Sequence, residues 1–303
     1  MAWLEYLLPL IFLTPLGAIA VVVLALRNLH DTQVRSPFNA QPLHGPGQAL
    51  RDRLDRIFSS LFLNGALGPI LVLTPLVYGM GRMLFAPHQN WLEWAIYGLL
   101  STLLVILFGF LLMLDYQRIR RVKFGLACEL AVGQELARLI RPETHPYFVF
   151  HDIPADTFTI DHVVVTPHGL FVIETRARTH PLDATGEPRR RVVVERERLR
   201  FPDWSERQPL RKTRQATTWL SQWLTRAHGI DVPVRGVLVL PDWDIDNEQL
   251  FDDPIVVNGE GLAQLLIDTS LGELDARTHD RIGQALIERA ALRNDRHLQR
   301  PSA

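Results

Sequence analysis

Three acidic residues stand in apolar surroundings in the C-terminal half of the chain. Asp161 interrupts the run Thr-Ile-Asp-His-Val-Val-Val, and Glu174 follows the run Leu-Phe-Val-Ile. Glu129 lies in an apolar stretch with helical spacing. Carboxylates in such surroundings need a partner, because an unpaired buried charge is costly. Grouped carboxylates are the hard oxygen ligands that Mg²⁺ and Mn²⁺ prefer, and a metal bound there could activate water against a phosphodiester.

Hydrophobic periodicity predicts the elements that must position these groups. Apolar residues recur at helical spacing in some segments and alternate in others. In chain order the prediction is a helix over 124–140, strands over 147–153, 159–166 and 170–175, a small hairpin over 192–201, a helix over 210–227, a strand over 234–240, and helices near 260–268 and 272–293. This order predicts a mixed α/β domain.

The turn predicted at residues 167–169 makes the strands of Asp161 and Glu174 antiparallel neighbours. Because side chains alternate along a strand, Glu174 and Arg176 share a face. The sequence therefore predicts two or three carboxylates and one cation around a common point. The functional hypothesis depends on Asp161 and Glu174 converging closely enough to bind one divalent ion.

The motifs around these residues resemble the nuclease-related domain (NERD) family. The similar segments are Glu129-x-x-Val-Gly-x-x-Leu, Phe150-His-Asp-Ile, Ile160-Asp-His-Val-Val and Gly169-Leu-Phe-Val-Ile-Glu-Thr-Arg, in this order within residues 121–245. The family looks like a branch of the PD-(D/E)XK fold, so the resemblance implies a restriction-endonuclease-like mixed sheet flanked by helices. It also implies catalytic roles for Glu129, Asp161 and Glu174, with Asp161 and Glu174 as ligands of Mg or Mn.

Arg176 departs from the family pattern, in which a lysine usually follows the strand glutamate by two residues. An arginine stays charged, so Arg176 cannot give up a proton, but it can clamp a phosphate and neutralise developing charge, and it is the fourth predicted catalytic residue. Lys212 could reach back from the following helix, and Glu135 is a second candidate for the helix carboxylate. The resemblance implies metal-dependent hydrolysis of DNA or RNA phosphodiesters, and the alternative is a catalytically degenerate scaffold that binds nucleic acid or protein.

Basic residues are concentrated after the strand glutamate. Residues 176–214 contain 12 basic and six acidic residues. A cluster of arginines beside a carboxylate site suits the backbone of a polyanion. The alternating charges of residues 195–198 favour a solvated hairpin for most of these arginines, so Lys212 and Arg214, with Arg176, are the predicted substrate contacts.

Four other signals have simpler explanations. Residues 242–248 begin like a calcium loop but lack its glycine, which favours an ordinary acidic loop. His162 points away from Asp161 and is expected in the core. Cys128 is expected to be a small buried residue, and Trp219 and Trp223 to be core residues rather than a stacking platform.

The first 114 residues have a different composition. Residues 6–26, 57–81 and 94–114 contain no charged side chain and are each long enough to cross a bilayer as a helix. The sequence therefore predicts three transmembrane helices, with the lipid bilayer as a partner. The expected domains are a membrane domain at 1–114, the nuclease-related α/β domain at 115–258 and a helical extension at 259–303.

The distribution of arginine predicts the orientation in the membrane. Residues 27–56 contain five arginines and residues 86–93 contain none, which predicts an outside N-terminus and a cytoplasmic C-terminal domain, as in a bacterial inner membrane. Residues 50–58 form either an amphipathic helix on the membrane surface or the solvated start of the second span. Within the spans no charged residue is present, which argues against a transport function.

Overall fold

The computed structural model describes residues 45–84, 90–140, 147–246 and 253–298. Of these, residues 52–122 belong to one compact unit, and residues 45–51 and 123–298 belong to a second. The start of the first described helix therefore belongs to the second unit.

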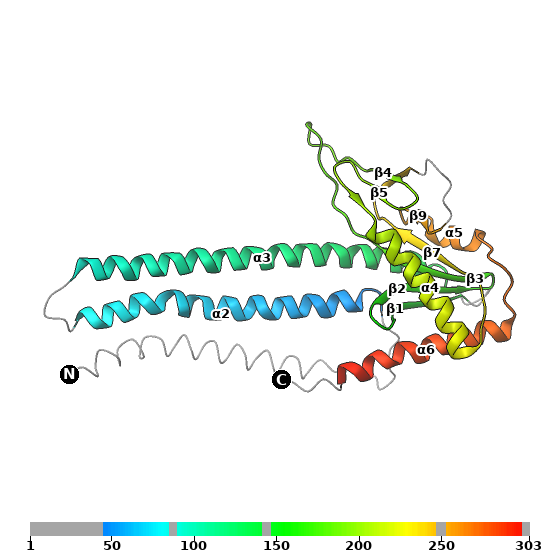
Figure 1. Ribbon diagram of the computed structural model, residues 1–303, viewed down its shortest axis with the longest axis horizontal. Helices are drawn as coiled ribbons and strands as arrows, with labels where there is room; N and C mark the ends of the chain where they lie inside the picture. The colour runs from blue at the N-terminus through cyan, green and yellow to red at the C-terminus, as the bar shows by residue number, and fades with distance from the viewer. Residues whose placement is uncertain (1–44, 85–89, 141–146, 247–252, 299–303) are drawn as a thin grey trace. The chain divides into compact units, whose positions relative to one another are not determined.

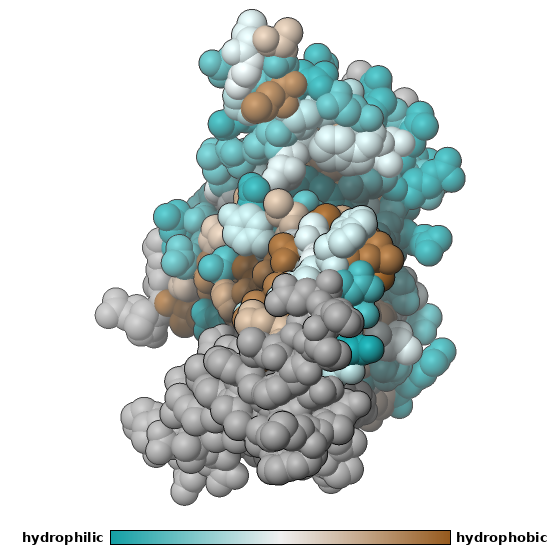
Figure 2. Space-filling model, turned by 90° about the vertical axis from the view of Figure 1, so that its left-hand side faces the viewer, coloured by the Kyte–Doolittle hydropathy of each residue, from teal (hydrophilic) through white to brown (hydrophobic). Residues whose placement is uncertain are grey.

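The first unit is an antiparallel pair made of most of α2 (Gln48–Leu84) and much of α3 (Trp91–Ala137) (Figure 1). Small residues let the two helices approach closely. Among the contacts that join them, Ser101 Oγ donates to Val72 O at 3.0 Å, Phe108 lies against Gly68, and Tyr97 lies against Gly79. The side chains along this pair are largely exposed and apolar, and they are the brown and white residues at the centre of Figure 2.

The three predicted spans have different outcomes. Residues 6–26 lie outside the described residues. Residues 94–114 lie within α3, which is the one helix of the described part of the chain that is long and apolar enough to cross a membrane. Residues 57–81 lie within α2, which does not qualify as a candidate span. Within the described residues, the structure therefore supports one candidate span where the sequence predicts two.

The predicted helix at 124–140 is not a separate element. It is the C-terminal part of α3, which continues without a break from Trp91 to Ala137. The charged residues of segment 115–123 favour a helix as strongly as the residues on either side of it. The helix therefore continues through this segment.

The second unit is built on a five-stranded mixed sheet in the order β1-β2-β3-β7-β9. The first three strands are antiparallel neighbours, while β3, β7 and β9 are parallel to one another. The strands are β1 (Phe148–Pro154), β2 (Thr159–Thr166), β3 (Gly169–Thr175), β7 (Val234–Val239) and β9 (Ile255–Val257). The mixed α/β architecture predicted from the sequence is confirmed.

A second sheet follows β3 in the chain and has the order β6-β5-β4-β8. Its strands are β4 (Arg191–Val194), β5 (Leu199–Arg200), β6 (Ser205–Glu206) and β8 (Asp244–Asp246). The segment that contains β4 and β5 lies at the top of Figure 2, where the surface is predominantly hydrophilic. Part of the predicted acidic loop is therefore a strand, β8, which pairs with β4. Arg190 donates to Asp242 at 2.7 Å and Arg191 to Asp246 at 2.8 Å, so these two arginines neutralise acidic residues of this segment.

Helices cover both faces of the large sheet. α4 (Gln208–His228) and α6 (Ala276–Leu298) pack with Val163, Val165 and Val172 on one face. α3 and α5 (Leu262–Asp268) pack with Val164 and Phe171 on the other. Alternate residues of β2 and β3 thus enter different cores, as the period of a strand requires. Side chains two residues apart on β2 therefore point to the same helices.

Trp219 and Trp223 pack against the core on the α4–α6 side, as expected from the sequence. Their rings are stacked with centroids 5.8 Å apart, and the Arg289 guanidinium lies 5.3 Å from the Trp219 ring. Arg289 also donates to Pro154 O at 2.8 Å. The aromatic pair is therefore covered by a cation from α6, which makes it a helix–helix contact.

A short strap, defined here as residues 46–50, lies along α3 in the second unit. It needs glycine on the helix, because a Cβ at Gly133 would lie 2.6 Å from the Pro46 Cβ atom. It also needs glycine in the strap, where Gly47 has φ +73° and a Cβ would lie 2.5 Å from Leu126 Cδ1. The strap includes the start of α2, and side chains of Pro46 and Leu126 pack directly on the two glycines.

Gly133→Ala is expected to lower the free energy of unfolding of the second unit by about 1–3 kcal/mol, because the strap must move away from α3. The matched control is Gly109→Ala in the same helix, where a Cβ would meet no atom within 4 Å. Denaturant unfolding followed by tryptophan fluorescence gives both values. Equal stability of the two variants would mean that moving the strap away from α3 costs no free energy.

Candidate active site

The two strand carboxylates lie at the same end of the β2–β3 pair. His162 is opposite Ile173 in the register, so Asp161 and Glu174 occupy the next positions along the two strands. Asp161 Oδ2 accepts a hydrogen bond of 2.9 Å from the backbone N–H of Thr175. This bond fixes the Asp161 carboxylate beside the residue that follows Glu174.

Lys212 of α4 joins these two carboxylates. Its Nζ atom lies 2.5 Å from Glu174 Oε2 and 3.5 Å from Asp161 Oδ1. The Glu174 side chain is fully buried, and those of Asp161 and Lys212 are 13% and 22% exposed. The structure therefore brings Asp161, Glu174 and Lys212 together, which is the geometry that a lysine reaching back from the helix requires.

Close packing of α4 on the sheet places Lys212 at this point. Gly236 of β7 makes that packing possible, since a Cβ there would lie 2.7 Å from Thr217 Oγ1 and 3.0 Å from Thr213 Cγ2. Thr213 is fully buried beside Lys212 in the sequence. The lysine therefore projects from the first turns of a helix that is held against the sheet.

Glu174 is an unusual carboxylate electrostatically. Burial, followed by the charge of Asp161, raises its pKa above the usual range, while Lys212 and Arg176 lower it. Among the described residues, neither of its oxygens has a hydrogen-bond partner. Glu174 Oε2 is in contact with the Lys212 ammonium group, and Glu174 Oε1 has the capacity to bind one more cation or donor.

Glu129 of α3 belongs to the same electrostatic group. Burial raises its pKa to about 8, and the charges of Asp161, Asp152 and Glu174 act in the same direction while Lys212 opposes them. Its Oε2 atom lies under the strap, 3.3 Å from where a Cβ of Gly47 would be. Glu129 is thus a sheltered carboxyl group that favours its protonated form.

Sequence reasoning gave no role to Asp152, which the structure places beside Glu129. Asp152 has φ +54°, is 3% exposed, and accepts a hydrogen bond of 3.2 Å from the backbone N–H of Ala49. It therefore satisfies one of the free N–H groups in the first turn of α2. The motif Phe-His-Asp-Ile was visible in the sequence. The left-handed backbone conformation of Asp152 and its hydrogen bond to a residue 103 positions away were not.

Arg176 and Arg214 have different environments. Arg176 is half-buried, with its guanidinium 3.8 Å from Glu174 Oε2, so it shares the face predicted for it. Arg214 donates to the carbonyls of Arg196 at 2.6 Å and Asp253 at 3.1 Å. A phosphate could reach Arg214 only by displacing these internal contacts.

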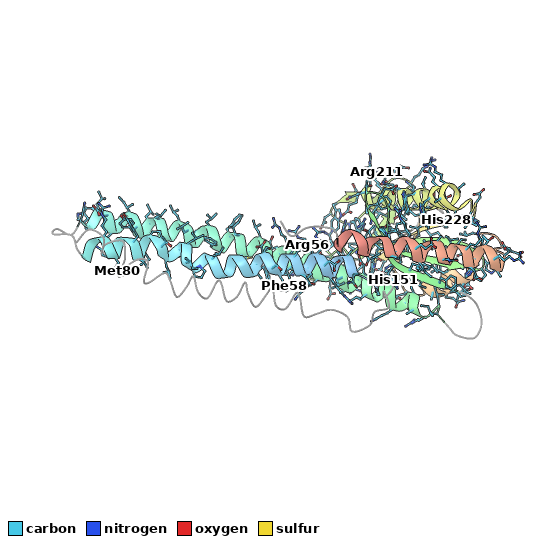
Figure 3. All side chains as sticks on the ribbon, turned by 90° about the horizontal axis from the view of Figure 1, so that it is seen from below. Arg56, Phe58, Met80, His151, Arg211 and His228 are labelled. Atoms are coloured by element: carbon cyan, nitrogen blue, oxygen red, sulfur yellow. The ribbon has the colours of Figure 1, made fainter. Side chains whose placement is uncertain are left out.

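Several arginines near the site form ion pairs within the protein, but two arginines at the start of α4 do not do so in the described part of the chain. Arg178 donates to both oxygens of Glu206 at 2.7 and 2.6 Å. Arg207 and Arg211 are exposed, and within the described part of the chain their side chains have no ion-pair partner. Arg211 projects outward from α4 (Figure 3). These two residues are better placed than Arg214 to meet an external phosphate.

The other face of β2 holds a buried histidine pair. His151, on β1, has its Nδ1 atom 2.7 Å from that of His162. Burial lowers the pKa of His151 to about 4 and that of His162 to about 3, so both rings are neutral and one donates to the other. His162 is fully buried, which confirms its expected place in the core. Burial likewise raises the pKa of Cys128 to about 11, as suits an unreactive core thiol.

The site offers two carboxylates, Asp161 and Glu174, to a divalent cation. Among the described residues, no group of three or more His, Cys, Asp or Glu side chains could hold a metal ion. Asp161 and Glu174 nevertheless converge on one cation, and Glu174 Oε1 is a buried oxygen without a hydrogen-bond partner in the described part of the chain. Mg²⁺ commonly binds one or two carboxylates and keeps several waters.

Comparison with known proteins covers the part of the chain that contains this site. Residues 124–241 match the family model described as nuclease-related domain (NERD). The matched range includes Glu129, Asp161, Glu174, Arg176 and Lys212. No curated protein and no solved structure matches the chain. The resemblance seen in the sequence is thus confirmed over this range, and it indicates a nuclease-related function.

Proposed function

We propose that this chain is a membrane-anchored enzyme that hydrolyses nucleic-acid phosphodiesters with Mg²⁺ or Mn²⁺. The observation that carries the proposal is the convergence of Asp161 and Glu174 on the Lys212 ammonium group in a nuclease-related domain. Paired carboxylates with a cation beside them are what binding a metal and a phosphate requires.

Each residue of the site has a role that follows from its chemistry. Asp161 and Glu174 would hold the metal ion, which supplies a Lewis acid and lowers the pKa of water when bound. Lys212 provides the ammonium group that the family pattern places after the strand glutamate. Arg176 stays charged and stabilises negative charge on the phosphate. Glu129, which is sheltered and favours its protonated form, can donate a proton to the leaving oxygen.

Anchoring in a lipid bilayer, with the second unit in the cytoplasm, is a separate part of the proposal. Its support is the exposed, charge-free stretch at 94–114 of α3 and the excess of arginine in residues 27–56. We expect the full chain to stay in the membrane fraction after washing at alkaline pH, and its release into the supernatant would contradict anchoring.

The catalytic part is tested with the purified full chain in detergent. Supercoiled DNA, single-stranded DNA and RNA are incubated with Mg²⁺, Mn²⁺ or a chelator. We expect cleavage that requires the metal and is absent in Glu174→Gln. The matched control is Glu135→Gln on α3, because that carboxylate pairs with Arg138 at 2.8 Å and lies outside the site.

A catalytically degenerate scaffold is the second candidate, and one observation favours it. Lys212 already compensates Glu174, and the described residues offer no third metal-ligating side chain. On this hypothesis the chain binds nucleic acid without cleaving it in either metal. Cleavage gained by Arg176→Lys, with none in the wild type, would show that the arginine alone disables the site.

A further inference from the structure

The register of α2 and α3 determines which of their charged residues lie at the same level. Phe108 lies against Gly68 and Tyr97 against Gly79, so the helices keep one antiparallel register. Twelve residues before Gly68 is Arg56, and twelve residues after Phe108 is Arg120. Because both helices are continuous over this range, Arg56 lies level with Arg120.

Five exposed arginines lie at this end of the first unit, and we call them the arginine belt. The belt consists of Arg53, Arg56, Arg118, Arg120 and Arg121. Three acidic residues accompany it, Asp52, Asp55 and Asp115, of which Asp115 pairs with Arg118 at 3.2 Å. At the opposite end of the pair, Arg82 faces Glu93 at 3.9 Å. The two ends therefore differ in charge, and only the belt has an excess of cations.

The belt adjoins an exposed apolar surface. Residues 94–114 carry no charge, and Phe110 and Tyr116 of α3 are 61% and 56% exposed. Trp91, at the other end of this stretch, is 78% exposed. A helix over 94–114 is about 30 Å long, which is the thickness of a bilayer core. Aromatic residues at both ends and arginines beyond one of them follow the pattern of an interface with lipid headgroups.

We propose that the arginine belt binds the phosphate groups of anionic phospholipids in one leaflet of the bilayer. The inference rests on the anchoring proposed above and adds a lipid class to it. Arginine recognises phosphate through paired N–H donors, and the negative potential of an anionic leaflet strengthens binding about fivefold for each basic residue. A nucleic acid is the weaker alternative, because the belt continues directly into exposed aliphatic and aromatic side chains.

The experiment uses the full chain in non-ionic detergent micelles. Short-chain phosphatidylglycerol, short-chain phosphatidylcholine or a DNA oligonucleotide is added, and bound molecules are counted by native mass spectrometry. We expect retention of phosphatidylglycerol in preference to phosphatidylcholine, weakened by salt. Replacing Arg53, Arg56 and Arg120 by Gln should reduce this preference by about a hundredfold.

Two variants separate the charge effect from misfolding. Replacing the same three arginines by Lys should retain most of the preference, and Arg82→Gln at the other end should leave it unchanged. Equal retention of the two lipids, loss in Arg82→Gln, or stronger competition by the oligonucleotide than by phosphatidylglycerol would overturn the proposal. Release of the wild-type chain from membranes at alkaline pH would instead disprove the anchoring, and that result is read in a separate assay.

Discussion

Lys212→Met is expected to lower the free energy of unfolding of the second unit by about 3 kcal/mol at neutral pH and to abolish cleavage. The substitution keeps the length of the side chain but removes the ammonium group that lies 2.5 Å from Glu174 Oε2. Without the ammonium group, the buried Glu174 carboxyl group must either keep a charge that nothing compensates or take up a further proton, because burial already raises its pKa, and either outcome costs free energy. Denaturant unfolding and the nuclease assay measure the two effects.

The chain has only one other lysine, Lys123, and this residue provides the control. Lys123 is exposed on α3, so Lys123→Met should change stability by a few tenths of a kcal/mol. A double substitution, Lys212→Met with Glu174→Gln, should lose less stability than the sum of the single ones, because no unpaired charge remains. Equal stability of Lys212→Met and Lys123→Met would show that the contact with Glu174 contributes nothing.

Local signals were sufficient to predict the strands that carry the two carboxylates. The strands expected at 159–166 and 170–175 correspond to β2, Thr159–Thr166, and β3, Gly169–Thr175. Alternating apolar residues and the turn between them depend only on neighbours in the chain. Asp161 and Glu174 on adjacent strands follow directly from this.

Features set by long-range packing were not predictable in the same way. β6, β8 and β9 have two or three residues each, too few for a periodic signal, and they form through pairing with distant strands. The approach of Lys212 depends on Gly236, whose importance appears only once α4 lies on β7. Arg214 looked like a free cation, but its carbonyl partners come from segments folded back onto α4.

The second unit is expected to lose stability as pH rises above 6.5, in metal-free buffer. The Glu129 carboxyl group has a pKa near 8 in the folded chain, and that of Glu174 is also raised, against 4.5 for an ordinary glutamate. Between these pKa values the folded chain binds more protons than the unfolded chain, so the free energy of unfolding falls as pH rises. The slope approaches about 1.4 kcal/mol per pH unit for each such group.

The histidine pair determines which part of the pH range is informative. His151 and His162 have lowered pKa values in the folded chain, so below their ordinary value of 6.5 the unfolded chain binds more protons and stability rises with pH. Between pH 4.5 and 6.5 the histidines and the buried carboxyl groups have opposite effects on stability. Above pH 6.5 only the carboxyl groups change it. Glu129→Gln, which is neutral at every pH, should make the decline above pH 6.5 shallower by removing the contribution of one of the two groups, whereas Glu135→Gln should not. A wild-type chain whose stability stays constant or rises between pH 6.5 and 8 would mean that Glu129 and Glu174 are ionised throughout and that the shelter of the strap and sheet does not favour protonation.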